Sequence, residues 1–219
     1  MKKLSGVIFD MDGLIFDTEM LYYKATQKVA DELGFAYSKE VYLDFLGVSD
    51  EEVWENYHQI YADKGTEAVD KFINESHAEV LRMFENGEAA LKPGVHQLMD
   101  YLNERKIPKI VASSNQRHVI ELLLENAQLK DEFIDIVSSE DVKRAKPDPE
   151  IFEVAVKRLN TAKEETLVLE DSQNGVLAAH KAGIPVIMVP DLLVPTDDLL
   201  AKTLHVLDSL EKVPDYFGD

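Results

Sequence analysis

Residues 6–19 read GVIFDMDGLIFDTE, and this stretch indicates the fold of the whole chain. Its first four residues, Gly6–Phe9, form a short apolar run without strict alternation. Such a run is typical of a strand that is buried on both faces of a parallel sheet. Two carboxylates, Asp10 and Asp12, follow the run directly, and a helical pattern begins at the end of the stretch.

Strand-like runs of the same kind recur along the chain, with amphipathic helical patterns between them. The further runs cover residues 109–112, 133–137, 166–169, 185–189 and 205–207. Before the first of these, Val95, Leu98, Met99 and Leu102 recur at the spacing of one helix face. Alternating strands and helices predict an α/β fold, namely a doubly wound, Rossmann-like parallel sheet with right-handed crossovers.

Residues 19–88 interrupt this alternation. They contain no strand-like run, and helix signals follow one another instead, including an apolar stripe from Val69 to Phe84. This segment carries six basic and sixteen acidic residues, a net charge of −10. We therefore expect two domains: an α/β core made of residues 1–15 and 90–219, and an inserted all-helical cap made of residues 16–89.

The overall composition excludes several classes of function. The 219 residues carry a net charge of −19, which repels nucleic acid and anionic lipid, so a bound phosphate needs a local cationic site. The absence of cysteine excludes disulfides and thiolate chemistry. No apolar stretch approaches the length of a membrane span or of a signal-peptide core. We expect a cytoplasmic monomer that acts on a small molecule.

Polar side chains follow four of the expected strands, at the sheet edge where ligands bind. In chain order they are Asp10-Met11-Asp12-Gly13, Ser113-Ser114-Asn115, Lys146-Pro147-Asp148-Pro149 and Glu170-Asp171-Ser172. Clustered carboxylates repel one another unless a cation lies between them. Because cysteines and metal-spaced histidines are missing, the ligands would be oxygens, and Mg²⁺ is the cation that fits them best.

The same segments also offer a place for a phosphate. We expect Ser113-Ser114-Asn115 to open a helix whose free N–H groups and dipole favour an anion. Lys146 adds a fixed positive charge, and we expect Asp148 and Pro149 to be the N-cap and first residue of the next helix. The sequence therefore predicts a site that binds a metal and a phosphate.

At this point the chain resembles the haloacid dehalogenase superfamily, in the branch of phosphatases and β-phosphoglucomutases with a helical cap after the first strand. The resemblance covers nearly the whole chain, and the order and spacing of its motifs agree. The motifs are DMDGLIFDTE at 10–19, VASSN at 111–115, AKPDPEIF at 145–152 and LEDSQNGVLAAHKAG at 169–183.

The resemblance implies four catalytic residues. Asp10 matches the nucleophile that forms an aspartyl-phosphate, and Asp12 matches the general acid and base. Ser113 matches a residue that bonds a phosphoryl oxygen. Lys146 matches the lysine that holds the nucleophile and the phosphoryl group together.

The resemblance also implies a metal site and substrate contacts. Mg²⁺ would be bound by Asp10, Asp171 and the backbone carbonyl of Asp12, with Glu170 beside the metal. Substrate or phosphate contacts are expected at Thr18, Glu19, Ser114 and Asn115. The implied function is a Mg²⁺-dependent phosphatase that hydrolyses a small phosphorylated metabolite, either a sugar phosphate or a nucleotide-like monophosphate.

A phosphosugar mutase of the β-phosphoglucomutase type is the alternative, and it needs a second phosphate grip in the cap. Such mutases carry a cap arginine just after a Gly-Val-Ser turn and a histidine in the first cap helix. Here Asp50 follows the turn at residues 47–49, and Tyr22 occupies the histidine position. We therefore expect hydrolysis rather than isomerisation.

Two further classes fit less well. Haloalkanoate dehalogenases of the superfamily need no metal and lack a second acid corresponding to Asp12. Phospho-acceptor receiver domains also combine an acidic pocket with Mg²⁺ and a lysine. Their acceptor aspartate does not follow the first strand, however, and they lack a helical insert of this length.

Overall fold

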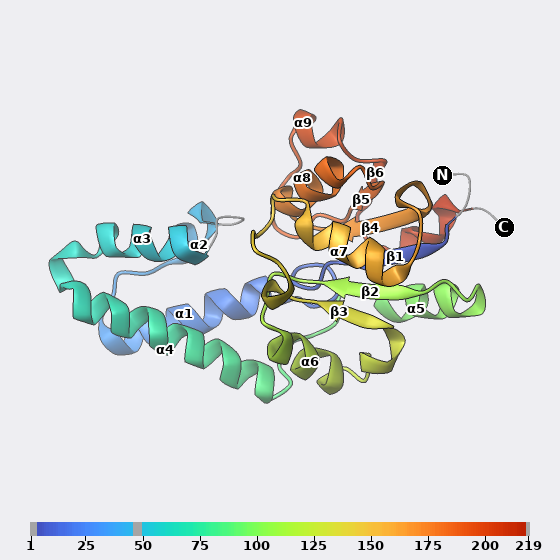
Figure 1. The fold of residues 1–219 in the computed structure, drawn as a ribbon. Helices are drawn as coiled ribbons and strands as arrows, with labels where there is room; N and C mark the ends of the chain where they lie inside the picture. Colours follow the sequence, from blue (N-terminus) through green and yellow to red (C-terminus); the bar gives the residue numbers. More distant parts are fainter. Residues whose placement is uncertain (1–3, 46–49, 218–219) are drawn as a thin grey trace. The chain divides into compact units, whose positions relative to one another are not determined.

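The computed structural model describes residues 4–45 and 50–217, without the side chains of residues 50 and 51. The chain forms two compact units, shown in Figure 1. Met1–Asp17 and Ala90–Asp219 make up one, here called the α/β unit, and Thr18–Ala89 make up the other, the helical unit. The turn at residues 47–49 that enters the mutase argument lies outside the described residues.

The α/β unit is built on a six-stranded parallel sheet, which confirms the predicted fold class. The strand order is β3-β2-β1-β4-β5-β6. The strands are β1 (Gly6–Phe9), β2 (Lys109–Ala112), β3 (Asp135–Val137), β4 (Thr166–Glu170), β5 (Val186–Met188) and β6 (His205–Val206). The chain adds strands in one direction from β1 to β3 and then in the opposite direction from β4 to β6. The order therefore switches between β1 and β4, and doubly wound sheets bind ligands at such a point. The loop that carries Asp10 therefore begins next to the end of β4.

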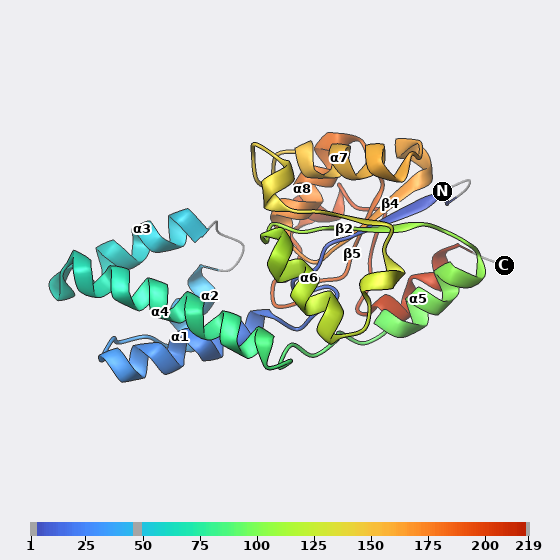
Figure 2. The same cartoon turned by 60° about the horizontal axis from the view of Figure 1, so that its bottom comes forward.

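Helices cover both faces of this sheet. Figure 2 shows α7 and α8 on one face and α5 and α6 on the other. The helices are α5 (Val95–Glu104), α6 (Arg117–Asn126), α7 (Glu150–Leu159), α8 (Gln173–Ala182) and the short α9 (Asp197–Leu200). Short 3₁₀ helices lie at Lys130–Glu132, Ser139–Asp141, Lys163–Glu165, Leu210–Lys212 and Pro214–Tyr216. Ile8, Ile110 and Val168 of the central strands pack against α7 and α8 in one apolar core.

Two predicted helix starts are wrong, one by four residues and the other by one. Helix α6 begins at Arg117 and not at Ser113, because the Ser113 hydroxyl accepts a hydrogen bond from the backbone N–H of Asn115 and holds a loop. Helix α7 begins at Glu150, with Pro149 as its N-cap. The Asp148 carboxylate accepts from the N–H of Glu150 at 3.1 Å, so it caps the helix from one position further out.

The helical unit consists of α1 (Glu19–Leu33), α2 (Lys39–Asp44), α3 (Asp50–Ile60), the 3₁₀ helix Ala62–Lys64 and α4 (Thr66–Glu85). Its core is mostly aromatic, with Phe72 packed among the rings of Phe35, Tyr37, Tyr57 and Tyr61. Helix α1 ends at Gly34, whose φ of 73° is the left-handed conformation that glycine adopts without strain. No helix in the described part of the chain has the length and apolar character needed to span a bilayer.

The chain leaves and re-enters the α/β unit along two segments that pair with each other. Asp17 donates its backbone N–H to Ala90 at 2.9 Å, and Lys92 donates its own to Ile15 at 2.8 Å. Phe16 bridges to Leu91 between these two bonds, in antiparallel fashion. The loop that carries Asp10 and Asp12 is therefore held against the returning segment.

Candidate active site

Lys146 lies between two buried carboxylates at the carboxyl edge of the central strands. Its Nζ is 2.5 Å from Asp10 Oδ1 and 2.8 Å from Glu170 Oε1, and it also donates to the carbonyl of Ala112. All three charged side chains are less than a tenth exposed. The Phe152 ring, 5.0 Å from Nζ, packs beside the ammonium. Asp10 directly follows β1 and Glu170 ends β4, so the pairing of these two strands brings the two carboxylates to one place.

Glu170 is fixed on its other side by the start of α8. Its Oε2 accepts hydrogen bonds from the backbone N–H and the hydroxyl of Ser172, at 2.7 and 2.8 Å. A β-carbon on Gly175 would lie 1.9 Å from this carboxyl group, so only glycine fits against it. The roles of Ser172 and Gly175 were not predicted. The available signal was Gly175 itself. Glycine inside a helical pattern lowers helix stability, so its presence there indicates that packing leaves no room for a side chain.

Asp12 is held by the loop that follows β2. Its Oδ2 accepts from the side-chain amide of Asn115 at 2.7 Å and from the Ser113 hydroxyl at 3.4 Å. Ser113 is fully buried, while Ser114 is exposed on the same loop. The structure thus brings Asp12, Ser113 and Asn115 into one hydrogen-bonded group next to Asp10.

Asp171 lies against Gly13. A β-carbon at Gly13 would come within 2.2 Å of Asp171 Oδ2, and the φ of Gly13 is 74°. Carboxylate oxygens of Asp10, Glu170 and Asp171 all lie within 4.8 Å of one another, and we call these three residues the carboxylate cluster. The Asp12 side chain is not part of it. The predicted role of Asp12 in metal binding concerned its backbone carbonyl and stays a prediction.

The charge balance of the carboxylate cluster favours a bound cation. Burial raises the pKa of Asp10 well above its ordinary value, and the Glu170 and Asp12 carboxylates raise it further, while Lys146 lowers it. Burial alone would lower the pKa of Lys146, but Asp10 and Glu170 raise it, so the ammonium keeps its proton. The ammonium of Lys146 pairs with two of the three carboxylates, and every ligand atom that the cluster offers is a hard oxygen. This donor set fits Mg²⁺.

The other two predicted site residues, Thr18 and Glu19, belong to the helical unit. Thr18 is fully buried and precedes the first turn of α1. The Glu19 carboxylate accepts a short hydrogen bond from the hydroxyl of Tyr42, which also contacts the Glu19 carbonyl. Burial and the Glu19 carboxylate both raise the pKa of Tyr42, so the hydroxyl stays a donor.

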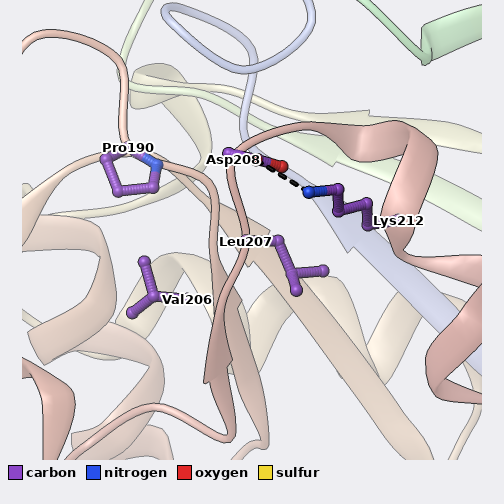
Figure 3. A pocket seen from close by; sticks show the side chains of 5 residues that line it. All are labelled: Pro190, Val206, Leu207, Asp208 and Lys212. Atoms are coloured by element: carbon purple, nitrogen blue, oxygen red, sulfur yellow. Dashed lines mark hydrogen bonds and ion pairs between the residues drawn. The ribbon is translucent and has the colours of Figure 1, made fainter.

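A pocket of about 430 Å³ also opens on the α/β unit beyond the end of β6. Figure 3 shows the residues that line it, which are Pro190, Val206, Leu207, Asp208 and Lys212. The carboxylate of Asp208 and the ammonium of Lys212 pair at 2.7 Å. None of the predicted site residues lines this pocket, so we do not assign the chemistry to it.

Comparisons with known proteins show which family this chain resembles in sequence and fold. A family model described as haloacid dehalogenase-like hydrolase matches residues 7–189. A phosphorylated carbohydrates phosphatase of Thermotoga maritima is 35% identical, with 83% of this chain and 82% of that protein covered. A probable pseudouridine-5'-phosphatase of Drosophila melanogaster is 31% identical over 99% of this chain and 93% of its own. A crystal structure of a putative β-phosphoglucomutase from Thermotoga maritima matches with a TM-score of 0.81 at 30% identity, covering 97% and 98% of the two chains.

Proposed function

This chain belongs to the haloacid dehalogenase-like hydrolases and is a phosphoric monoester hydrolase; from that premise we propose that it is a Mg²⁺-dependent phosphatase with Asp10 as its nucleophile. The proposed substrates are sugar phosphates or nucleotide-like monophosphates. The names of the two relatives, a carbohydrate-phosphate phosphatase and a probable pseudouridine-5'-phosphatase, support these two classes.

The observation that carries the proposal is the position of the Lys146 ammonium between Asp10 and Glu170. Lys146 holds one oxygen of the Asp10 carboxylate and so restricts its rotation. Its buried positive charge also attracts the equatorial oxygens of a phosphoryl group, which otherwise repel an approaching carboxylate. An ion pair with a structural role needs only one carboxylate. Lys146 instead pairs with two carboxylates of a cluster of three, which supports a role in the reaction.

In the proposed reaction an oxygen of Asp10 forms a bond to phosphorus while the ester oxygen leaves with a proton from Asp12. Water then attacks the aspartyl-phosphate, gives its proton to Asp12, and the bond between Asp10 and phosphorus breaks. Asn115 and Ser113 orient the Asp12 carboxylate for both transfers. Covalent catalysis divides one displacement into two, and a positioned acid and base contributes about 10²–10⁴ in rate.

The residues that would hold the metal are Asp10, Asp171 and the backbone carbonyl of Asp12, with Glu170 next to them. When bound, Mg²⁺ neutralises negative charge on the phosphoryl group. The protein contributes a rigid set of oxygens: Ser172 and Gly175 fix Glu170, and Gly13 lets Asp171 approach the loop of the nucleophile.

We further propose that the helical unit is the cap that selects the substrate, through residues that include Thr18 and Glu19. The mutase alternative would require a free cation in this unit for a second phosphate. Three of its basic residues are already engaged: Lys28 and Arg82 pair with the buried Glu79, and Lys64 donates to the carbonyl of Gly34. These pairings leave fewer cations of this unit for a second phosphate.

A screen for released phosphate tests the proposal. Purified protein with Mg²⁺ is incubated with a panel of sugar phosphates and nucleoside monophosphates, beside Asp10→Asn and the surface control Asp208→Asn. We expect turnover of at least one panel member by the wild type and by Asp208→Asn, and none by Asp10→Asn. Equal turnover by Asp10→Asn would contradict the proposal.

A further inference from the structure

Asp191 is a buried aspartate whose two carboxylate oxygens differ. One accepts a hydrogen bond, and the other has no partner among the described residues. The residue follows β5, and only 8% of its side chain is exposed. Its Oδ1 accepts from Lys92 Nζ at 2.5 Å. Its Oδ2 is buried and has no hydrogen-bond partner in the described part of the chain.

Two other carboxylates of the same unit, Glu170 and Asp141, are bonded at both oxygens. Glu170 accepts from Lys146 on one oxygen and from Ser172 on the other. Asp141 accepts from Arg158 on one oxygen and from Ser138 and Arg117 on the other. A buried polar atom without a partner is rare in folded proteins and indicates a donor that the chain itself does not supply.

Asp191 lies beside the carboxylate cluster. The point where a β-carbon of Gly13 would stand is 2.2 Å from Asp171 Oδ2 and 3.4 Å from the β-carbon of Asp191. Both aspartates therefore border the same glycine. The backbone N–H of Val189 donates to the carbonyl of Glu170 at 2.8 Å, which keeps the loop after β5 next to the end of β4.

From these contacts we infer that Asp191 is a positioning residue for the metal site: its Oδ2 accepts a hydrogen bond from a water molecule bound to Mg²⁺ at the carboxylate cluster. The inference rests on the proposed function. Mg²⁺ held by a few carboxylates keeps several waters, and these need acceptors. Carboxylates outside the ligand set commonly supply them.

Lys92 sets the orientation of Asp191. Its ammonium binds Oδ1, and its backbone N–H donates to the carbonyl of Ile15 on the loop that carries Asp12. Both ends of Lys92 are thus anchored within the α/β unit. The bond to Lys92 thereby holds Oδ1 and leaves Oδ2 for the water.

Direct Mg²⁺ titration of the full-length protein by calorimetry, without substrate, tests this role. Asp191→Asn keeps the shape of the side chain but places an amide where two acceptors are needed. We expect it to weaken Mg²⁺ binding by about 10–100-fold, the usual effect of losing an outer contact of a metal site. The exposed Asp208→Asn variant removes the same charge elsewhere on this unit and should bind Mg²⁺ like the wild type.

A second variant separates the hydrogen bond from the charge. Lys92→Met with Asp191→Leu removes one positive and one negative charge together, and apolar residues often replace a buried ion pair without loss of stability. We expect this double variant to lose Mg²⁺ affinity as Asp191→Asn does.

Wild-type Mg²⁺ affinity in both variants would overturn the role of Asp191. That result would leave the proposed function intact, provided that phosphate release by the wild type still depends on Mg²⁺. Phosphate release by the wild type in excess chelator would instead contradict the proposed function, and the role of Asp191 with it.

Discussion

The carboxyl group of Glu170 occupies the space in which a side chain on Gly175 would begin, because a β-carbon there would lie 1.9 Å from Oε1. The contact joins the end of β4 to the first turn of α8. It keeps Glu170 between Ser172 and Lys146, where the carboxylate completes the cluster. Gly175 is therefore required for the position of Glu170 in the site.

Gly175→Ala tests that contact. On an open helix this change stabilises a protein by up to about 1 kcal/mol. Here we expect the opposite sign, a loss of about 1–3 kcal/mol from overpacking. Displacement of Glu170 should also lower kcat by about 10²-fold, since misplaced catalytic groups have effects of that size. Urea unfolding and phosphate release are the measurements.

The exposed Gln173 on the same turn of α8 offers a matched control. Gln173→Ala should change neither stability nor kcat appreciably. A Gly175→Ala protein that is as stable and as active as Gln173→Ala would show that the contact is unimportant.

Much of the fold could be predicted because its strands are short apolar runs, which can be recognised from the local sequence without knowledge of their partners in the sheet. The first run, Gly6–Phe9, matches β1 at both ends, and α1 begins at Glu19, where the helical pattern begins. The start of α6 was wrong because a side-chain bond from Ser113 to a neighbouring backbone group competes with the helix, and sequence pattern does not reveal that choice. Helix α2 was missed because its six residues are too few to show a helical period.

The candidate site divides in the same way. Residues that directly follow β1, β2 and β4 were predictable, because parallel strands bring their carboxyl ends together. The pair of Lys92 and Asp191 was not predicted, since 99 residues separate its members and neither lies in a recognisable pattern. Such a pair becomes visible only when the chain is folded.

Asp141 gives a prediction for stability as a function of pH. Burial opposes ionisation of this carboxyl, but bonds from the Ser138 backbone and the Arg158 guanidinium lower its pKa to about 2. Because the pKa is lower in the folded state, ionised Asp141 stabilises the fold at pH values above its pKa in the unfolded chain, about 3.9. This contribution is lost as the pH falls toward 2. Asp141→Asn should therefore destabilise the protein at pH 7 by about 2 kcal/mol.

The same difference should shrink steadily between pH 4 and pH 2. Urea unfolding of wild type and Asp141→Asn at several pH values measures it, and Asp100→Asn, at an exposed position of α5, serves as the control. A difference between wild type and Asp141→Asn that stays constant down to pH 2 would mean that the bonds to Asp141 do not set its pKa.

Removal of the metal should stop the enzyme. We expect phosphate release to cease after treatment with a chelator and to return with Mg²⁺. Ca²⁺ should restore it poorly, because its larger and looser shell displaces the oxygens that must be in line. Asp171→Asn should raise the Mg²⁺ concentration needed for half of the maximal rate. Undiminished activity in excess chelator would refute this account of the carboxylate cluster.

The enzyme should hydrolyse monophosphates and not interconvert glucose 1-phosphate and glucose 6-phosphate. A mutase holds two phosphates at once, and the net charge of −10 on residues 19–88 disfavours a second dianion there. A coupled assay for glucose 6-phosphate from β-glucose 1-phosphate, primed with the bisphosphate, is run beside phosphate release. Isomerisation faster than phosphate release would reverse the assignment in favour of the mutase.

The covalent step on Asp10 is the centre of this account, and chemical trapping tests it most directly. The protein is mixed with a substrate that it hydrolyses, and the reaction is quenched in acid during turnover. The protein is then reduced with borohydride, digested and examined by mass spectrometry. Borohydride converts an aspartyl-phosphate to homoserine, so we predict homoserine at position 10 and at no other aspartate, and none without substrate. Homoserine at another position, or its absence during rapid turnover, would contradict the assignment of Asp10 as the nucleophile.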